Sequence, residues 1–404
     1  STIYSWTNSN PGIGLAATGT GGIASFTATN NGTSPVVATI VVTPTFTNGG
    51  AGCPGSTKTF TITVNPTAQV IQPANQVVCN GATTSTITFT TNNTGGSTAY
   101  NWINSNAGIG IAASGTGDIA SFTAINNGTS PIVATIVVTP IFTNAGITCN
   151  GPTKSFTITV NPTAQVIQPV SLVVCNSQPT TVSYGTVNAG GTTVYTWTNS
   201  LPAIGLPATG TGNISFNAVN NGTAPIVATI VVTPTFTNAG VSCSGPAKTY
   251  TITVNPGAQV NQPTSQVVCN GDATTAISFT TNNTVGATSY TWTNSNPAIG
   301  LLGTGTGNIA SFTASNNGTS PVVATIVVTP TFTNAGVTCP GSSKTFTITV
   351  NPTGQVNQPV DQVVCNGQLT TVTYATVNTG GTTTYSWTNS LPAIGLPANG
   401  TGNI

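Results

Sequence analysis

The sequence predicts an all-β fold, a tandem array of antiparallel β-sandwich domains with about seven strands each. No segment shows a helical period, and short runs rich in β-branched residues alternate with Asn-Gly and Gly-Thr-Gly turns. One eight-residue segment, Val-Ala-Thr-Ile-Val-Val-Thr-Pro, occurs four times without a change, at Val37–Pro44, Val133–Pro140, Val227–Pro234 and Val323–Pro330. Each copy is predicted to be a core strand that ends at its proline, because proline cannot donate the next ladder bond.

The repeat is about 95 residues long, the distance between successive tryptophans at Trp6, Trp102, Trp197, Trp292 and Trp387. A unit of this length can bury its own core, so the repeats are predicted to follow one another as beads on a string. The predicted domains are a partial repeat at 1–66, whole repeats at 67–162, 163–256 and 257–352, and a partial repeat at 353–404. Because both partial repeats carry the Trp strand, we expect a section of a longer covalent array rather than two halves that complete each other.

The first repeat illustrates the elements in chain order. A strand around Trp6 is followed by a strand at 23–28, an Asn-Asn-Gly-Thr turn at Asn30–Thr33, the eight-residue segment and a last strand at 58–64. In this last strand apolar residues alternate with threonines, which predicts one face in the core and one in water. Each repeat then closes at an Asn-Pro pair, followed by a second proline a few residues later, so we expect semi-rigid joints. The pairs are Asn65-Pro66, Asn161-Pro162, Asn255-Pro256 and Asn351-Pro352.

Charged residues are almost absent. The chain has four lysines, no arginine, three aspartates, no glutamate and no histidine, and 2% of its residues are charged. This composition excludes nucleic-acid binding and leaves no parts for acid–base or metal catalysis, so we predict no enzyme activity, cofactor or metal. Asp118, Asp272 and Asp361 lie at non-equivalent positions, so there is no repeated calcium site. The apolar runs are too short to insert into a membrane.

Three repeated residue types have a structural and a functional interpretation. The tryptophans are expected in the core, and the alternative is a sugar-stacking platform. The Asn-Asn-Gly-Thr turns are expected to be structural, although they are also glycosylation sequons at Asn31, Asn127, Asn221 and Asn317. One lysine starts each last strand and is expected to protect a sheet edge from aggregation. These lysines are Lys58, Lys154, Lys248 and Lys344.

Eight regularly spaced cysteines, with no histidine and no CxxC pair, indicate disulfides and an oxidising, extracellular setting. A bridge from Cys53 to Cys79 would span a last strand, a connector and a first strand. Pairing within a repeat instead closes loops of nearly constant length, and joins the first strand to the start of the last. We therefore expect the pairs Cys79–Cys149, Cys175–Cys243 and Cys269–Cys339, with Cys53 and Cys365 paired outside this chain.

The recurring motifs resemble those of a known repeat family. The order Val-Cys-Asn-Gly, Tyr-x-Trp, Ile-Gly-Leu, Gly-Thr-Gly-Asn-Ile, Val-Thr-Pro, Cys-x-Gly and Phe-Thr-Ile-Thr-Val-Asn-Pro is similar to PKD-like, Ig-like repeats of very large secreted proteins of Bacteroidota. It looks most like giant gliding-motility adhesins of the SprB type, which are exported by type IX secretion. The resemblance covers the whole chain and implies Ig-like sandwiches without catalytic residues.

The predicted function is a structural stalk of a cell-surface adhesin, which extends an adhesive tip for surface attachment and, by the resemblance, for gliding. The expected partners are neighbouring repeats, surface polysaccharide or other cell-surface proteins. Two alternatives remain: a multivalent glycan-binding array, marked by an exposed aromatic in each repeat, and a self-assembling extracellular filament, marked by a repeated apolar patch.

Overall fold

The structure, a computed structural model, describes all 404 residues and is a tandem array of all-β, Ig-like sandwich repeats. Its only helical elements are 3-10 turns of three residues each, and none of its helices is long and apolar enough to cross a membrane. The chain forms two compact units, whose bounds do not follow the predicted repeat boundaries. The repeat boundaries therefore stay a proposal. The first unit is Ser1–Gln168, Tyr184–Thr196 and Val232–Lys248, and the second is Pro169–Ser183, Trp197–Val231 and Thr249–Ile404.

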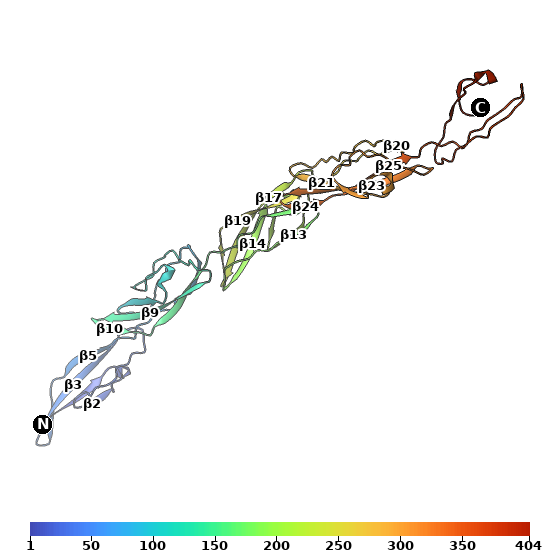
Figure 1. Cartoon of the computed structure of the whole chain (residues 1–404). Helices are drawn as coiled ribbons and strands as arrows, with labels where there is room; N and C mark the ends of the chain where they lie inside the picture. Colours follow the sequence, from blue (N-terminus) through green and yellow to red (C-terminus); the bar gives the residue numbers. More distant parts are fainter. The chain divides into compact units, whose positions relative to one another are not determined.

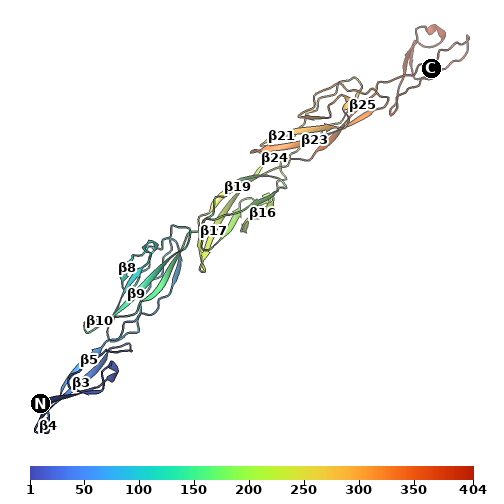
Figure 2. The ribbon, with the colours of Figure 1, turned by 60° about the horizontal axis from the view of Figure 1, so that its bottom comes forward.

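The second repeat, within the first unit, shows the plan of a whole repeat. Its elements are β6 (Gln76–Cys79), β7 (Ser97–Asn104), η2 (Ala107–Ile109), β8 (Ser114–Thr116), β9 (Ile132–Asn144), β10 (Ile147–Asn150) and β11 (Lys154–Asn161). The sheet order is β6-β11-β9-β7-β8, and β10 pairs with the far end of β9. All of these pairings are antiparallel except that of β6 with β11, which is parallel. Strands β8, β9 and β10 are labelled in Figure 2.

A second layer covers the inner face of this sheet. It is made of two extended segments that touch through bridges between Thr83 and Thr123 and between Ile87 and Ile119. Inward-facing residues of both layers form one core, in which Ile136 of β9 and Ile158 of β11 are fully buried. Burial raises the pKa of the Tyr100 phenol, which lies in this core beside Phe89. The burial of these inward-facing residues matches the face that the alternation of apolar and polar residues predicted to pack inward.

The same elements recur in the other repeats. The first repeat contains β1 (Thr2–Asn8), η1 (Pro11–Ile13), β2 (Thr18–Thr20), β3 (Val36–Asn48), β4 (Ala51–Pro54) and β5 (Lys58–Val64). The fourth contains β20 (Gln266–Cys269), β21 (Ala287–Asn294), η4 (Pro297–Ile299), β22 (Thr304–Thr306), β23 (Val322–Asn334), β24 (Val337–Pro340) and β25 (Lys344–Asn351). Strands β21, β23 and β25 run side by side in the sheet (Figure 1).

The third repeat contributes to both compact units. Its elements are β12 (Leu172–Cys175), β13 (Pro179–Val182), β14 (Thr192–Asn199), η3 (Pro202–Ile204), β15 (Thr209–Thr211), β16 (Ile214–Asn217), β17 (Ile226–Asn238), β18 (Val241–Ser244) and β19 (Lys248–Asn255). Here the second layer is a regular pair of strands, β13 with β16. The fifth repeat contains only β26 (Ser386–Thr388), η5 (Pro392–Ile394) and β27 (Asn399–Thr401).

Two local predictions were wrong. The segment 23–28 is not a strand: the equivalent segments of the second and fourth repeats form only isolated bridges, and only the third repeat has a strand there, β16. The long strands also do not end at proline: β9 runs through Pro140 to Asn144. Along one edge of β9 the partner strand changes. The pairing with β11 extends as far as Val138 of β9, and the pairing with β10 starts at Ile141 of β9. Pro140 lies in this gap, so its missing N–H removes no ladder bond, and its carbonyl accepts from Gly151 N at 3.0 Å.

Four of the five tryptophans lie in the core, as predicted, and Trp387 is partly exposed. Trp6, Trp102, Trp197 and Trp292 are each 7% exposed. The ring of Trp102 lies against Gly115, where a Cβ atom would stand 2.1 Å from the ring. This contact explains the glycine inside the Gly-Thr-Gly motif, because any side chain there would displace the tryptophan from the core.

Candidate functional site

The joints between repeats hold a repeated set of polar contacts, and the first three joints are each built around a β-hairpin. In the second repeat β9 and β10 are connected by Ala145 and Gly146, with φ of 50° and 74°. Positive φ at both turn positions matches the twist of a tight hairpin. Phe142 of β9 lies opposite Cys149 of β10 in this hairpin. The hairpins of β17 with β18 and of β23 with β24 repeat this arrangement.

An asparagine pair joins each hairpin tip to the preceding repeat. At the joint after the second repeat, Asn161 donates to the Asn238 carbonyl at 3.1 Å, and Asn238 donates to Asn161 Oδ1 at 2.9 Å. Asn161 is the asparagine of the Asn-Pro motif and is fully buried. The same pair forms between Asn65 and Asn144, and between Asn255 and Asn334. Burial makes these bonds costly to lose, because an unpaired amide could not reach water.

A second asparagine fastens the connector from the other side. Asn188 donates to the carbonyls of Thr129 and Thr163 at 3.3 and 3.1 Å, and its Oδ1 accepts from Gln165 N at 2.6 Å. One side chain therefore ties together the turn of one repeat, the connector and the next repeat. Asn93, Asn283 and Asn378 occupy the same place at the other joints. The expectation of semi-rigid joints stays a prediction.

Each of these hairpins also carries an aromatic ring that packs against a glycine. Phe142, Phe236 and Phe332 are fully buried, and each ring lies against a glycine where a Cβ would stand 2.4–2.5 Å away. These glycines are Gly96, Gly191 and Gly286. In the first repeat the equivalent Phe46 is 54% exposed. In the second, third and fourth repeats the segment before the Trp strand therefore covers this ring.

The disulfides connect neighbouring repeats, which corrects the predicted pairing. Cys79 is bonded to Cys243 and Cys175 to Cys339, each with a Cα–Cα distance of 5.5 Å and a sequence separation of 164. Each bond runs from the first strand of one repeat to the hairpin of the next. The predicted pairs Cys79–Cys149, Cys175–Cys243 and Cys269–Cys339 are therefore wrong.

The parallel pairing of first and last strands is the physical reason for this correction. Cys79 lies beside Asn161 at the end of β11, not beside its start. Cys149 lies beside Phe142, near the opposite end of β9. The intervening length of β9, from Ile132 to Phe142, spans roughly 33 Å at about 3.3 Å per residue, far beyond the reach of a disulfide.

Four cysteines form no disulfide in this structure: Cys53, Cys149, Cys269 and Cys365. The expectation that Cys53 and Cys365 pair outside the chain stays a prediction. Cys269 occupies the same position as Cys79 and Cys175, because it lies beside Asn351 as they lie beside Asn161 and Asn255. A cysteine of the first strand beside an asparagine of the last strand therefore recurs in the second, third and fourth repeats.

The Asn-Asn-Gly-Thr turn is structural, but it does not depend on positive φ at its glycine. Asn126 is buried and donates to the carbonyls of Ser130 and Val160, and its Oδ1 accepts from Gly128 N. The sequon residue Asn127 is exposed. Lys154 lies on the part of β11 that β6 does not cover, so it marks a sheet edge as predicted.

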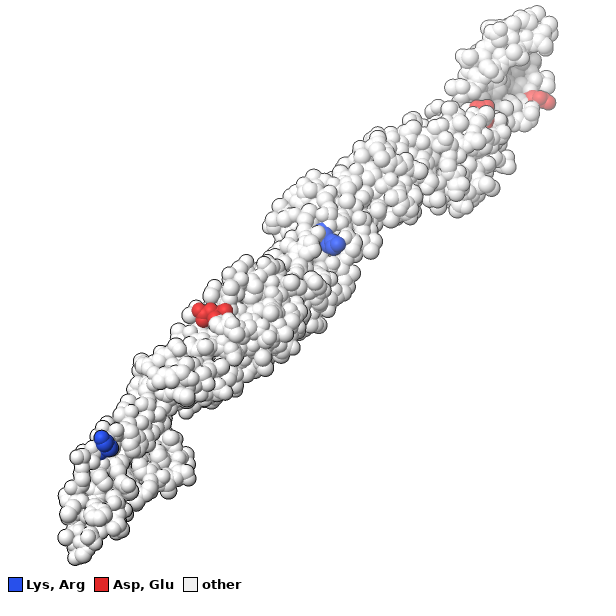
Figure 3. Space-filling model, turned by 90° about the vertical axis from the view of Figure 1, so that its left-hand side faces the viewer, with Lys and Arg blue, Asp and Glu red and all other residues white.

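Charged side chains take no part in the joints. On the face shown in Figure 3 they stand as isolated spots on an otherwise uncharged surface. The joints therefore depend on amide hydrogen bonds, ring packing and disulfides. The Asn-Pro motif was noted in the sequence, but its partner, the asparagine of the Phe-Thr-Asn motif, was not predicted. The recurrence of Phe-Thr-Asn at the end of every long strand was the signal that could have revealed it.

No protein-family model matches the chain, and no curated protein matches it. Among solved structures, the chain is similar to EC1–4 of Drosophila N-cadherin (14% identity, 87% of this chain and 92% of that chain, TM-score 0.28). It is also similar to immunoglobulin domains 1–5 of Sidekick-1 (11%, 87% and 74%, 0.27) and to three N-terminal domains of the outer capsid protein Hoc of bacteriophage RB49 (12%, 71% and 99%, 0.35). Identities this low leave the function to be argued from the residues of this chain.

Proposed function

We propose that this chain is a tension-bearing extracellular stalk, in which disulfides and buried hydrogen bonds stiffen the joints. The observation that carries the proposal is the double covalent connection at a joint. The main chain crosses at Pro162, and the Cys79–Cys243 bond crosses beside it, because Cys79 lies next to Asn161. Bending such a joint would require breaking the asparagine pair or moving the hairpin.

Three further properties support this function. Disulfides persist in oxidising compartments, which favours an extracellular location. Near-identical repeats supply length rather than distinct binding pockets. The almost uncharged surface offers no site for an ionic ligand. The scarcity of charged residues and the lack of histidine also support a non-enzymatic role.

Stretching single molecules tests the proposal. The shortest covalent path through both disulfides uses residues 1–79, 175–243 and 339–404, roughly half of the chain. At about 3.5 Å per residue, the unfolded chain should extend to about 750 Å when oxidised and about 1,400 Å when reduced. The oxidised chain should also show few unfolding steps at low force.

A variant in which Cys79 and Cys175 are both changed to serine provides the control. It should reach the longer extension without any reductant. Equal extensions for oxidised and reduced wild-type protein would contradict the proposal, because the disulfides would then carry no tension.

The finer proposal is that the stalk belongs to a cell-surface adhesin, and that this adhesin serves gliding motility in a member of the Bacteroidota. It is supported by the resemblance of the repeat motifs alone. An antibody against the repeat should label long surface fibres on source cells, and movement of the label along the cell would indicate gliding. Label that stays fixed would count against the gliding role.

The two alternative functions find less support. A glycan-binding array needs an exposed aromatic in each repeat, but four of the tryptophans are 7% exposed. A laterally assembled filament needs a large repeated apolar patch. The first valine of the eight-residue segment is exposed in four repeats, yet one side chain per repeat is much smaller than such a patch. These valines are Val37, Val133, Val227 and Val323.

A further inference from the structure

The connector between the third and fourth repeats differs from the other connectors at its third residue. The other three connectors begin with Asn-Pro-Thr, whereas this one begins with Asn-Pro-Gly, in which the glycine is Gly257. The backbone does not require a glycine here, because Gly257 is not one of the glycines with positive φ. A Cβ atom at this position would meet only the Pro340 carbonyl oxygen, at 4.0 Å. The glycine therefore leaves open a space that a threonine side chain occupies in the other connectors.

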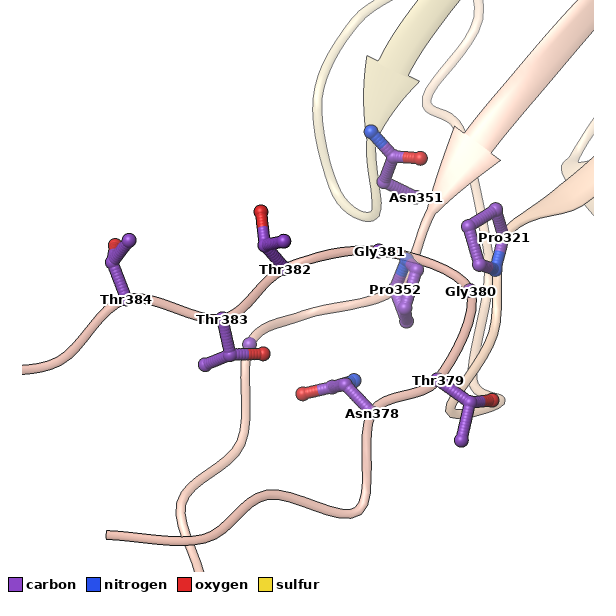
Figure 4. A pocket seen from close by; sticks show the side chains of 11 residues that line it. Pro321, Asn351, Pro352, Asn378, Thr379, Gly380, Gly381, Thr382, Thr383 and Thr384 are labelled. Atoms are coloured by element: carbon purple, nitrogen blue, oxygen red, sulfur yellow. The ribbon is translucent and has the colours of Figure 1, made fainter.

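The threonine hydroxyl at this position has a defined partner at two other joints. After the second repeat, Asn80 donates to Thr163 Oγ1 at 3.0 Å. After the fourth repeat, where Asn351 borders another pocket (Figure 4), Asn270 donates to Thr353 Oγ1, also at 3.0 Å. In both cases the hydroxyl satisfies an amide N–H of the asparagine that follows the first strand.

Asn176 is the equivalent asparagine of the third repeat, and its amide lacks this partner. Its Oδ1 accepts from Asn220 N at 2.8 Å, the same distance as the equivalent bonds in the second and fourth repeats. This bond fixes which end of the amide faces Asn220, so Nδ2 is directed toward the space beside Gly257. Asn176 is half-buried, and its Nδ2 donates no hydrogen bond within the chain. A partly desolvated N–H without a partner is therefore ready to bind an acceptor.

A pocket of about 380 Å³ includes this space. Asn176 and Gly257 line it together with Asn221 and Gln259, whose side-chain amides also make no hydrogen bond within the chain. No charged residue lines the pocket. Uncharged amides that can both donate and accept suit a neutral ligand that is rich in hydroxyl groups.

The backbone that borders the pocket is firmly held. Ala258 of the connector forms a parallel bridge with Gly341, and a Cβ at Gly341 would stand 1.9 Å from the Ala258 carbonyl oxygen. Gly341 N donates to the Pro330 carbonyl at 3.1 Å, and the Cys175–Cys339 disulfide holds the same hairpin. A ligand therefore meets a preformed surface, and little ordering opposes its binding.

A second pocket, of about 390 Å³, continues along the same connector. The two pockets share Ala258, Gln259 and Ser342, and the second extends to Asn282 and Lys344. Adjoining pockets along one connector match two linked sugar residues better than one small molecule.

We propose that this joint carries a site for a neutral carbohydrate, in which one sugar hydroxyl takes the place of the missing threonine hydroxyl and accepts a hydrogen bond from Asn176 Nδ2. The amides of Asn221 and Gln259 bind further hydroxyls of the same ligand. No aromatic ring lines the pocket, so binding is weak, with a Kd of about 1 mM or more. This is a single site, distinct from a glycan-binding array, and it does not depend on whether the stalk bears tension.

Saturation-transfer NMR on the 404-residue chain tests the site, with maltose, cellobiose and lactose as the probes. At least one of these disaccharides should receive magnetisation from the wild-type protein. Gly257→Thr restores the hydroxyl of the other connectors and should abolish this signal. The same substitution should raise the melting temperature, because Asn176 gains a partner and the unfolded chain loses freedom, so a loss of binding cannot be ascribed to unfolding.

Two further variants locate the site. In a chain that already carries Gly257→Thr, Thr163→Gly opens the equivalent space beside Asn80 and should restore binding at the preceding joint. Gly354→Thr is the matched control in the next connector: a Cβ there would meet no atom within 4 Å, and the signal should not change. A signal that survives Gly257→Thr would show that the sugar binds elsewhere, and no signal from any of the three probes would show that water alone fills the space. Either result would overturn the proposal.

Discussion

Asn161 and Asn238 hold the second and third repeats together through two amide hydrogen bonds, in which Asn161 is fully buried and Asn238 partly buried. Neither residue is charged, so the contact is insensitive to salt, unlike an ion pair at a similar surface. Its strength comes from exclusion of water: the amide of Asn238 has no other partner when Asn161 is removed. Asn161 therefore fixes the hairpin tip beside the Cys79–Cys243 disulfide, which holds the same hairpin covalently.

Asn161→Ala should lower the free energy of unfolding by about 1–3 kcal/mol, because it leaves Asn238 unpaired. Urea denaturation followed by circular dichroism measures this change. Asn351→Ala is the matched control: the residue ends the same strand in the fourth repeat but meets no hairpin here, so its effect should be below about 0.5 kcal/mol. Equal effects of the two substitutions would show that the asparagine pair is not what matters.

At the scale of elements, the hairpin of a repeat packs against the segment before the Trp strand of the same repeat, and this segment also meets the preceding repeat, because Gly95 lies beside Pro35. Three joints have a glycine of positive φ before the ring seat, at Gly95, Gly190 and Gly380. The joint between the third and fourth repeats instead has Val285, with φ of 59°. A β-branched residue in this left-handed region is strained, at a general cost of about 1–2 kcal/mol.

Val285→Gly should therefore stabilise the second compact unit by about 1 kcal/mol. The reciprocal change, Gly190→Val, should destabilise the first unit, since a Cβ at Gly190 already stands 3.0 Å from Pro131. Thermal unfolding by calorimetry measures both. A destabilised Val285→Gly variant would show that the valine side chain contributes packing that outweighs the strain.

Much of the repeat could be predicted from local patterns, and the joint could not. Alternation in the last strand predicted which face is buried, since side-chain period follows directly from strand geometry. Phe156, Ile158 and Val160 of the second repeat are buried, whereas Phe60 of the first repeat is 47% exposed. The path of β9 beyond Pro140 was missed because a proline tolerated at a change of partner looks the same in sequence as one that ends a strand. The partners of Cys79 and Asn161 lie in the next repeat, and only the parallel register of β6 reveals that direction.

At the scale of the whole molecule, the two disulfide loops overlap. The loop from Cys79 to Cys243 and the loop from Cys175 to Cys339 share residues 175–243. Pairing within repeats would instead have produced separate loops, each confined to one domain. The overlapping arrangement connects the second, third and fourth repeats into one covalent network.

Tryptic digestion of the denatured, unreduced chain distinguishes the two pairings. The four lysines are the only trypsin sites, and cleavage there gives 59–154, 155–248 and 249–344 as the three internal fragments. The disulfides in the structure should hold all three together as one species until reductant is added. Three separate fragments without reductant would restore the pairing within repeats.

The spacing of 164 residues also sets an order of events as the chain is synthesised from its amino terminus. Of these three thiols Cys79 emerges first. Cys149 then follows long before Cys243, which is the partner of Cys79. An oxidant acting on the unfolded chain would favour the nearer thiol, because closing a shorter loop costs less entropy. Once the second repeat has folded, its own sheet holds Cys79 and Cys149 near opposite ends of β9. Correct maturation therefore requires folding of each repeat to precede oxidation of its thiols, and premature oxidation should trap misbridged chains.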